Sequence, residues 1–346
     1  MDQIAFIYGS IFVYWSDILL VMGGTVAICM YLALYLHREG TAAAGLVSVP
    51  LCVAFSLLLA RFVHWYCRTD NYSSLATAMM DHTSGGYALA GVFAGCALAA
   101  LLPRLVKLSD NLPRMLDCMA VAGSAGIAVG RLSCFFNTAD RGMVVTAFRG
   151  LPWAWPVTNP VSGAEELRLA TFFLQALVAA GLFVALLVFW LAESRKRRPH
   201  WGDTCLIFLL CYGASQVLMD STRYDSLYFR SNGFVSIVQV LGACALGLAA
   251  IIFSVRLVRN CGWKNWYVAL WLGLAALIGL GGFMEYFVQR YSHKVMIGYS
   301  IMAVALVGIV AVILVVRGLS VSAEKKQHRY AAWMQQEISD GRYNGQ

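Results

Sequence analysis

Long apolar stretches dominate the chain and alternate with short polar connections. A stretch of about 20 apolar residues lets a helix cross the roughly 30 Å hydrocarbon core of a bilayer. Such stretches lie at about 11–36, 45–67, 87–106, 118–136, 169–192, 203–219, 233–255, 266–288 and 296–316. The pattern therefore predicts an all-α polytopic membrane protein with about nine transmembrane helices.

The amino-acid composition supports this class. Hydrophobic residues make up 60% of the 346 residues and charged residues only 13%, and a water-soluble domain of this composition would expose large apolar patches. Neither a basic region before the first stretch nor a small-residue cleavage site after it is present, so we expect this stretch to remain as a helix.

Basic residues mark alternate connections between the predicted spans. Lysine and arginine concentrate on the cytoplasmic side of membrane proteins, and they occur at Arg104, Lys107 and the run 195–198, whereas the other connections carry both signs, as at Asp140 and Arg141. The pattern predicts an N-terminus outside and a C-terminus in the cytoplasm. The net charge of +8 comes mostly from this cytoplasmic belt. Because no soluble basic face exists, nucleic acid is not an expected partner.

The ten cysteines lie largely inside spans and form no CxxC pair. This distribution indicates small apolar side chains that fill the bundle rather than a disulfide framework or a zinc site. We therefore expect neither a metal nor a cofactor.

Polar side chains inside the spans gather near the predicted outer ends of four helices. Charged residues at a helix centre cost about 2.5–3.5 kcal/mol, so they are candidates for function. They are Asp17, Arg61, His64, Arg131, Asn137, Gln216, Asp220 and Arg223. Gln216, Asp220 and Arg223 are spaced i, i+4 and i+7, which places them on one stripe of a helix.

Arg131 follows three glycines, Gly123, Gly126 and Gly130, which allow a neighbouring helix to approach closely. Its guanidinium can bind a phosphate through two hydrogen bonds. Two interpretations stay open. Arg131 and Arg61 pair with Asp220 and Asp17 as structural contacts, or they line a pocket for an anionic phospholipid headgroup. The pocket requires guanidinium groups that face a common space and are not sealed by carboxylates.

Two motifs carry a resemblance to a known family. Residues 130–142 read GRLSCFFNTADRG and residues 212–223 read YGASQVLMDSTR, with Trp15, Arg61 and Gln239 in matching order. Over about residues 5–258 the chain resembles the prolipoprotein diacylglyceryl transferases, bacterial inner-membrane enzymes that move diacylglycerol from phosphatidylglycerol to the lipobox cysteine of a prolipoprotein. The resemblance implies a seven-helix core at 1–258, an additional helix pair at 259–318 and a cytoplasmic tail at 319–346.

Several reactive positions of the family differ in this sequence. Ala90 stands at the family's histidine and Ala139 at its glutamate, with Asp140 one residue later; Gln216 replaces an arginine and Asp220 a glutamate. Further departures are Cys134 at an asparagine and Ser16 at a tyrosine, and the side chains that could substitute for the missing base include His64, His82 and Tyr87.

The preferred hypothesis is a divergent phosphatidylglycerol-dependent diacylglyceryl transferase, or a related phospholipid-headgroup transferase, acting at the outer leaflet. Asp140 or Asp220 serves as acid or base. The lipid-binding side chains are Arg131, Asn137, Arg223, Gln216, Arg61 and Gln239. The expected partners are phosphatidylglycerol or another anionic phospholipid and a prolipoprotein.

The alternative is a catalytically inactive relative that binds phospholipid or lipoprotein as a scaffold or partner subunit. A transporter is disfavoured, because the sequence shows no inverted repeat and no charged residue in the cytoplasmic half of a predicted span.

Overall fold

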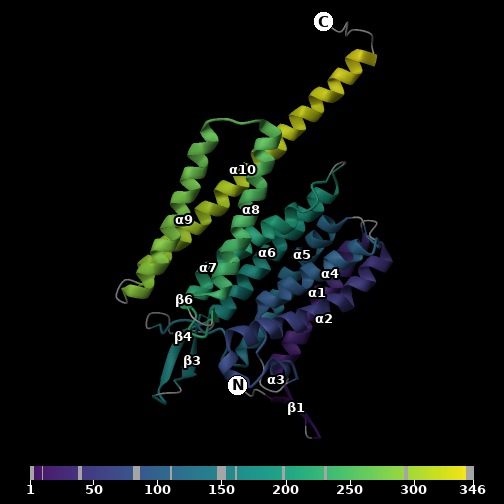
Figure 1. The fold of residues 1–346 in the computed structure, drawn as a ribbon. Coiled ribbons are helices and arrows are strands. Elements are labelled where there is room, and N and C mark those ends of the chain that lie inside the picture. The colour runs from purple at the N-terminus through teal and green to yellow at the C-terminus, as the bar shows by residue number, and fades with distance from the viewer. Residues whose placement is uncertain are drawn as a thin grey trace. The chain divides into compact units, whose positions relative to one another are not determined.

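The computed structural model describes residues 4–9, 11–37, 41–80, 86–109, 111–145, 153–159, 162–196, 199–229, 232–291 and 295–339. The long helices are α1 (Trp15–His37), α2 (Ala42–Cys67), α4 (Leu89–Leu105), α5 (Leu112–Arg131), α6 (Thr171–Ser194), α7 (Asp203–Ser221), α8 (Ile237–Cys261), α9 (Trp266–Arg290) and α10 (Val295–Ser339) (Figure 1). Eight of these helices are long and apolar enough to cross a membrane, and α4 is a shorter apolar helix. The predicted all-α polytopic fold is confirmed.

Among the described residues, three two-stranded antiparallel hairpins accompany the helices. They are β1 (Ile4–Tyr8) with β2 (Ile11–Tyr14), β3 (Ala154–Thr158) with β4 (Glu165–Leu169), and β5 (Tyr228–Phe229) with β6 (Asn232–Ser236). Residues 11–14 and 233–236 are therefore strands, although the apolar pattern predicts them as parts of helical spans. Aromatic and β-branched residues are apolar in both structures, so hydropathy alone does not separate a strand from the start of a helix.

The chain divides into two compact units, residues 1–243 and 244–346, with the boundary inside α8. In the first unit α5 packs against α1, α6 and α7, and α2 packs against α4. The buried core around α5 contains Tyr35, Met115, Val121, Trp190 and Phe208. The central position of α5 matters for function because Arg131 is its last residue.

Glycines bring α1 and α5 into backbone contact. A Cβ atom on Gly23 would lie 2.7 Å from the carbonyl oxygen of Gly126 and 2.8 Å from the nitrogen of Gly130. The expected close approach is confirmed at these two positions of α5, whereas a Cβ on Gly123 would meet nothing within 4 Å. This packing fixes the end of α5 beside α1.

A carboxylate near the start of α5 caps the start of α7. Asp117 is 1% exposed, and it accepts hydrogen bonds from the backbone nitrogens of Gly202, at 2.7 Å, and Cys205, at 2.8 Å. These backbone groups have no partner within the helix, so Asp117 stabilises the helix end. Asp117 lies one residue before the predicted span at 118–136, because α5 begins earlier than the apolar stretch.

The second unit contains most of α8 together with α9 and α10. Asn260 of α8 donates to the hydroxyl of Ser320 in α10, at 3.1 Å, and Trp271 of α9 donates to Ser254 of α8, at 3.3 Å. At 1.5 Å per residue, the 45 residues of α10 extend about 68 Å, more than a bilayer core requires. Residues 319–339, the described part of the predicted tail at 319–346, continue this helix.

Candidate functional site

One end of α5 positions Arg131 for contact with the loop that follows. A short 3₁₀ helix, η2 (Leu132–Phe135), comes directly after α5 and turns the chain. Asp140 then adopts a left-handed backbone conformation with φ of +55°, which aspartate tolerates better than most residues. The turn brings the Asp140 carboxylate back to the helix that it follows.

The Asp140 carboxylate contacts two guanidinium groups. Its Oδ2 atom accepts from Nη1 of Arg131, and its Oδ1 atom pairs with Nη2 of Arg223. All three side chains are largely buried. The structure thus brings together three of the predicted site residues, which come from α5, the following loop and the segment after α7.

Arg223 has two further carboxylate partners. Its Nη1 atom lies 3.2 Å from Oδ1 of Asp220, and its Nε atom lies 3.0 Å from Oδ1 of Asp225. Asp220 is 1% exposed and also accepts from the hydroxyl of Ser236. Asp225 was not among the sequence candidates, because it follows α7 in a loop where helical periodicity gives no signal. We call Arg131, Asp140, Asp220, Arg223 and Asp225 the charged cluster.

Backbone contacts hold the loop at 140–142 against the end of α7. The nitrogen of Asp140 donates to Oδ2 of Asp225, at 2.8 Å, and Gly142 forms an antiparallel bridge with Arg223. The nitrogen of Phe172, at the start of α6, donates to the carbonyl of Asp140, at 3.1 Å. The charged cluster is therefore fixed by three helix ends as well as by its ion pairs.

An arginine in this loop, Arg141, was not among the predicted site residues. Arg141 is 1% exposed, and its Nη2 atom donates to the carbonyl oxygens of Cys134, at 2.8 Å, and Asn137, at 2.7 Å. The guanidinium carbon lies 4.4 Å from the centre of the Phe172 ring and 5.6 Å from that of Trp155. Burial lowers the pKa of Arg141 below its usual value.

The side chains of Asn137 and Gln239 accept hydrogen bonds from backbone nitrogens of neighbouring residues. The side-chain oxygen of Asn137 accepts from the nitrogen of Ala139, at 3.0 Å, which stabilises the turn before Asp140. Gln239 accepts from the nitrogen of Ser236, at 3.0 Å, at the start of α8. Both residues therefore shape the segments that carry the charged cluster.

Gln216 lies one helical turn before Asp220 and faces α6. Its side-chain oxygen accepts from Nε2 of Gln175, at 3.4 Å. Both side chains are buried, and Oε1 of Gln175 and Nε2 of Gln216 have no hydrogen-bond partner among the described residues. Gln175 is a further polar residue that the sequence reading missed.

Arg61 binds the segment that follows its own helix. Its Nε atom donates to the carbonyl of Ala78, at 2.6 Å, and its Nη1 atom to that of Gly86, at 3.0 Å. The guanidinium also lies over the rings of Tyr72 and Tyr87, at 5.1 and 5.4 Å. These contacts join the connection after α2 to the start of α4.

The side chains considered as substitutes for the missing base lie close to Arg61. Nδ1 of His64 lies 3.2 Å from the hydroxyl of Tyr72, and Tyr87 covers the Arg61 guanidinium. His82 lies outside the described residues.

Chemically, the charged cluster can bind an anion or move a proton. The Asp140 carboxylate already binds both Arg131 and Arg223, so the requirement for guanidinium groups not sealed by carboxylates is not met in this structure. A phosphate carries the same kind of oxygen atoms and could bind these groups in place of Asp140. Within the described ranges, no group of three or more histidine, cysteine, aspartate or glutamate side chains could hold a metal ion.

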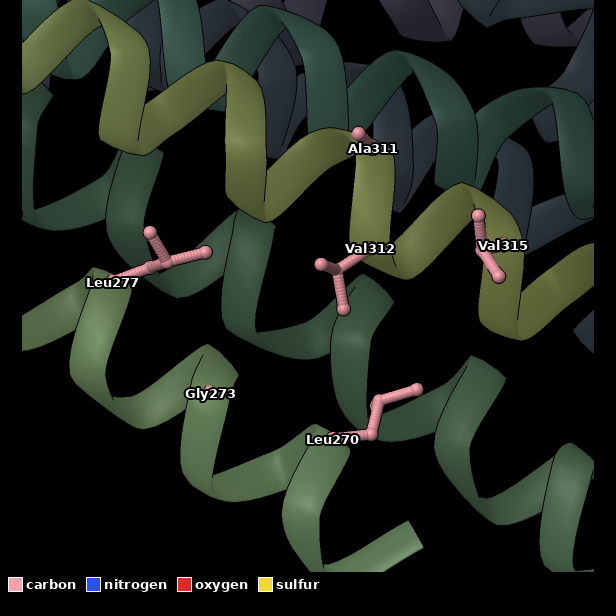
Figure 2. A pocket seen from close by; sticks show the side chains of 6 residues that line it. All are labelled: Leu270, Gly273, Leu277, Ala311, Val312 and Val315. Atoms are coloured by element: carbon pink, nitrogen blue, oxygen red, sulfur yellow. The ribbon is translucent and has the colours of Figure 1, made fainter. Parts of the chain in front are cut away.

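The second unit contains an apolar groove between α9 and α10, with a volume of about 480 Å³ (Figure 2). It is lined by Leu270, Gly273, Leu277, Ala311, Val312 and Val315. This lining offers only hydrocarbon, so it can hold an apolar chain but supplies no group for acid–base chemistry.

The fold and the charged cluster define a class of protein, a polytopic membrane protein with buried ion pairs at the ends of its helices. A family model described as prolipoprotein diacylglyceryl transferase matches residues 3–255. The chain therefore belongs to the prolipoprotein diacylglyceryl transferase family. The matched region contains the whole charged cluster and ends within α8.

Similar proteins carry the name phosphatidylglycerol–prolipoprotein diacylglyceryl transferase. One from Parasynechococcus marenigrum is 27% identical over 260 residues, covering 72% of this chain and 91% of that protein. Another from Clostridium perfringens is 26% identical over 258 residues, covering 74% of this chain and 95% of that protein.

Proposed function

We propose that this chain transfers a diacylglyceryl group, or a related part of a phospholipid, from phosphatidylglycerol at the outer leaflet of a bacterial inner membrane. The observation that carries the proposal is the meeting of Arg131 and Arg223 on one carboxylate inside the matched region. The names of the relatives supply the substrate class, phosphatidylglycerol and a prolipoprotein.

In the proposed reaction the phospholipid phosphate takes the place of the Asp140 carboxylate between Arg131 and Arg223. Cationic N–H groups stabilise the charge that grows on the phosphate as it leaves. A thiolate of the acceptor attacks the glyceryl carbon, the carbon–oxygen bond to phosphate breaks, and glycerol phosphate leaves. The new bond joins that carbon to sulfur.

The acceptor thiol must lose its proton in this reaction. A thiol with a pKa near 8.5 is only a few per cent thiolate at neutral pH, and a positioned base contributes about 10² to 10⁴ in rate. Asp140, once released from the two arginines, is the proposed proton acceptor. Asp220 holds Arg223 in place and is the second carboxylate available for proton transfer.

The other predicted lipid-binding residues surround this centre in the proposal. Gln216 offers an amide to the glycerol headgroup from the next turn of α7, and Asn137 and Gln239 hold the turns that carry Asp140 and Ser236. Arg61 contributes to the entrance beside α4, where it binds the carbonyl of Gly86.

The proposed orientation places the charged cluster on the outer side, with the N-terminus outside and the C-terminus in the cytoplasm. Supporting this, the connections between α2 and α4, between α5 and α6, and between α7 and α8 follow the spans at the end opposite the basic run 195–198.

The test uses the purified full chain in liposomes with phosphatidylglycerol labelled in its acyl chains and a peptide that carries a lipobox cysteine. We expect label on the peptide thiol, none on a peptide with serine at that position, and at least a hundredfold slower transfer by Arg131→Met. Arg168→Gln is the matched control, since Arg168 pairs with Glu166 in the β3–β4 hairpin. Absence of transfer to this or any other acceptor by folded wild-type protein contradicts the proposal.

A specific observation favours the alternative, a non-catalytic lipid-binding or lipoprotein-binding subunit. Arg131 and Arg223 already have carboxylate partners within the chain, and alanine stands at positions 90 and 139. If this alternative holds, the triple variant Ala90→His, Ala139→Glu and Gln216→Arg gains transfer activity that the wild type lacks. A folded triple variant with no activity would indicate a pocket converted to another use.

A further inference from the structure

Arg141 differs from the two arginines of the charged cluster in how its charge is balanced. Arg131 and Arg223 each contact at least one carboxylate. None of the ion pairs found among the described residues includes Arg141, although its side chain is almost completely buried. Asp225 lies near enough to act on it electrostatically, but that carboxylate is bound to Arg223.

The donors of Arg141 are only partly used. Both hydrogen bonds that the structure describes come from Nη2, and both go to backbone carbonyls. Nε and Nη1 are buried and have no hydrogen-bond partner in the described part of the chain. Because Nε carries one N–H group and Nη1 two, three of the five donors of this guanidinium are unused.

Aromatic rings contribute to holding this charge but do not satisfy its donors. Phe172 and Trp155 lie near the guanidinium, where a cation is attracted to the ring electrons. An unpaired buried charge is nevertheless costly, and unsatisfied buried donors call for a partner. An anion supplies both the missing charge and the missing acceptors.

Cys134 connects Arg141 to the charged cluster. The Cys134 carbonyl accepts from Nη2 of Arg141, while its sulfur lies 3.6 Å from Oδ2 of Asp140, the oxygen atom that Arg131 contacts. Cys134 therefore contacts the Arg141 guanidinium through its carbonyl and the Asp140 carboxylate through its sulfur.

We infer that Arg141 is a third anion-binding side chain of this site, and that it binds the phosphate of an anionic phospholipid headgroup. Phosphate suits the position because it has several oxygen atoms that can accept from guanidinium donors pointing in different directions. The inference rests on the proposed function for its ligand, and it adds a residue that neither of the two family motifs singled out.

Binding is measured on the full chain in detergent with dioctanoyl phosphatidylglycerol, with inorganic phosphate and with dioctanoylglycerol, which lacks phosphate. We expect Arg141→Gln to weaken phosphatidylglycerol binding about tenfold to a hundredfold, the effect of losing charge-assisted hydrogen bonds. The control Arg168→Gln should change it less than about threefold. Dioctanoylglycerol binding should be equal in wild type and variant. A matching loss with inorganic phosphate would show that the phosphate alone is recognised, and a loss confined to the lipid would show that the whole headgroup is needed.

Arg141→Lys covers the case in which Arg141→Gln does not fold, since it keeps the charge but loses the planar fork. We expect it to fold and to bind phosphatidylglycerol more weakly than wild type. Wild-type affinity in either folded variant, or an equal loss in Arg168→Gln, overturns the inference. Because binding is measured without transfer, a failed transfer assay with an intact Arg141 effect rejects the proposed function and leaves this inference standing.

Discussion

The two ends of α5 hold buried carboxylates in opposite ways. Near its start, Asp117 accepts from backbone nitrogens of Gly202 and Cys205. Beyond its end, Asp140 contacts the side chains of Arg131 and Arg223. Arg131 lies 14 positions after Asp117 along the helix, a rise of about 21 Å at 1.5 Å per residue.

The two carboxylates, Asp117 and Asp140, differ in whether a ligand anion could take their place. A backbone nitrogen at the start of a helix is fixed by the fold, so its carboxylate partner is structural. A guanidinium on a side chain can exchange one anion for another of similar shape. Buried charge in a membrane protein is therefore best judged by the type of its partner, because burial alone is the same at both ends.

We expect the largest loss of stability from a variant that tests whether the charged cluster is one network. Arg223→Met leaves Asp220 buried without its cation, and breaking a buried pair in this way costs about 3–5 kcal/mol. We expect a loss of this size in unfolding by SDS titration. Arg168→Gln, which breaks the more exposed pair with Glu166, should cost clearly less. Equal losses in the two variants would mean that the cluster is a set of independent surface contacts.

Asp117→Ala tests the structural end of α5. The change removes two hydrogen bonds from the start of α7, and we expect the free energy of unfolding to fall by about 2 kcal/mol. Phospholipid binding per folded molecule should stay at the wild-type level. A selective loss of binding in well-folded Asp117→Ala would contradict the division between a structural and an exchangeable end.

Variants of the glutamine pair between α6 and α7 distinguish a role in packing from a role in headgroup binding. Gln175→Leu alone strands its partner Gln216 and should cost about 1–2 kcal/mol, whereas Gln175→Leu with Gln216→Leu should be close to neutral, because two apolar side chains then face each other. Thermal unfolding of both variants measures this. If Gln216 also binds the headgroup, the double variant stays stable but binds phosphatidylglycerol more weakly; unchanged affinity would limit the pair to packing.

The smallest expected effect is a pH dependence of stability that arises from Glu166 in the β3–β4 hairpin. A hydrogen bond from Asn159 and the nearby Arg168 hold the pKa of Glu166 below its usual value. The carboxylate therefore adds stability above the ordinary glutamate pKa of about 4.3, and this stability is lost as the pH falls through the lower pKa of the folded state. Asn159→Ala should raise that pKa. Carbon-13 NMR of labelled glutamate from about pH 3 to 6, assigned with Glu166→Gln, measures it; an unchanged titration would remove Asn159 as the cause.

Much of the charged cluster could be predicted from the sequence. Arg131 occurs inside a long apolar stretch, and Asp220 and Arg223 follow directly after another at the same predicted depth; α7 ends at Ser221, so Arg223 lies just beyond the predicted helical stripe. Asp140 was identified from its place in a family motif. The residues that were missed gave no pattern in the sequence. Asp225 and Arg141 lie in loops, where helical periodicity does not indicate which way a side chain faces. Gln175 looks like a single polar residue in an apolar helix.

Sequence alone determined the class of this protein, because the hydropathy of a 20-residue stretch is a local property that decides whether a helix can cross a bilayer. The tertiary structure decided the partners of each charge. An ion pair needs atoms within about 4 Å, and Asp140 and Arg223 reach that distance only because α6 and α7 return the chain to the end of α5. The same return left Arg141 buried with unused donors, which no pattern along the chain could have shown.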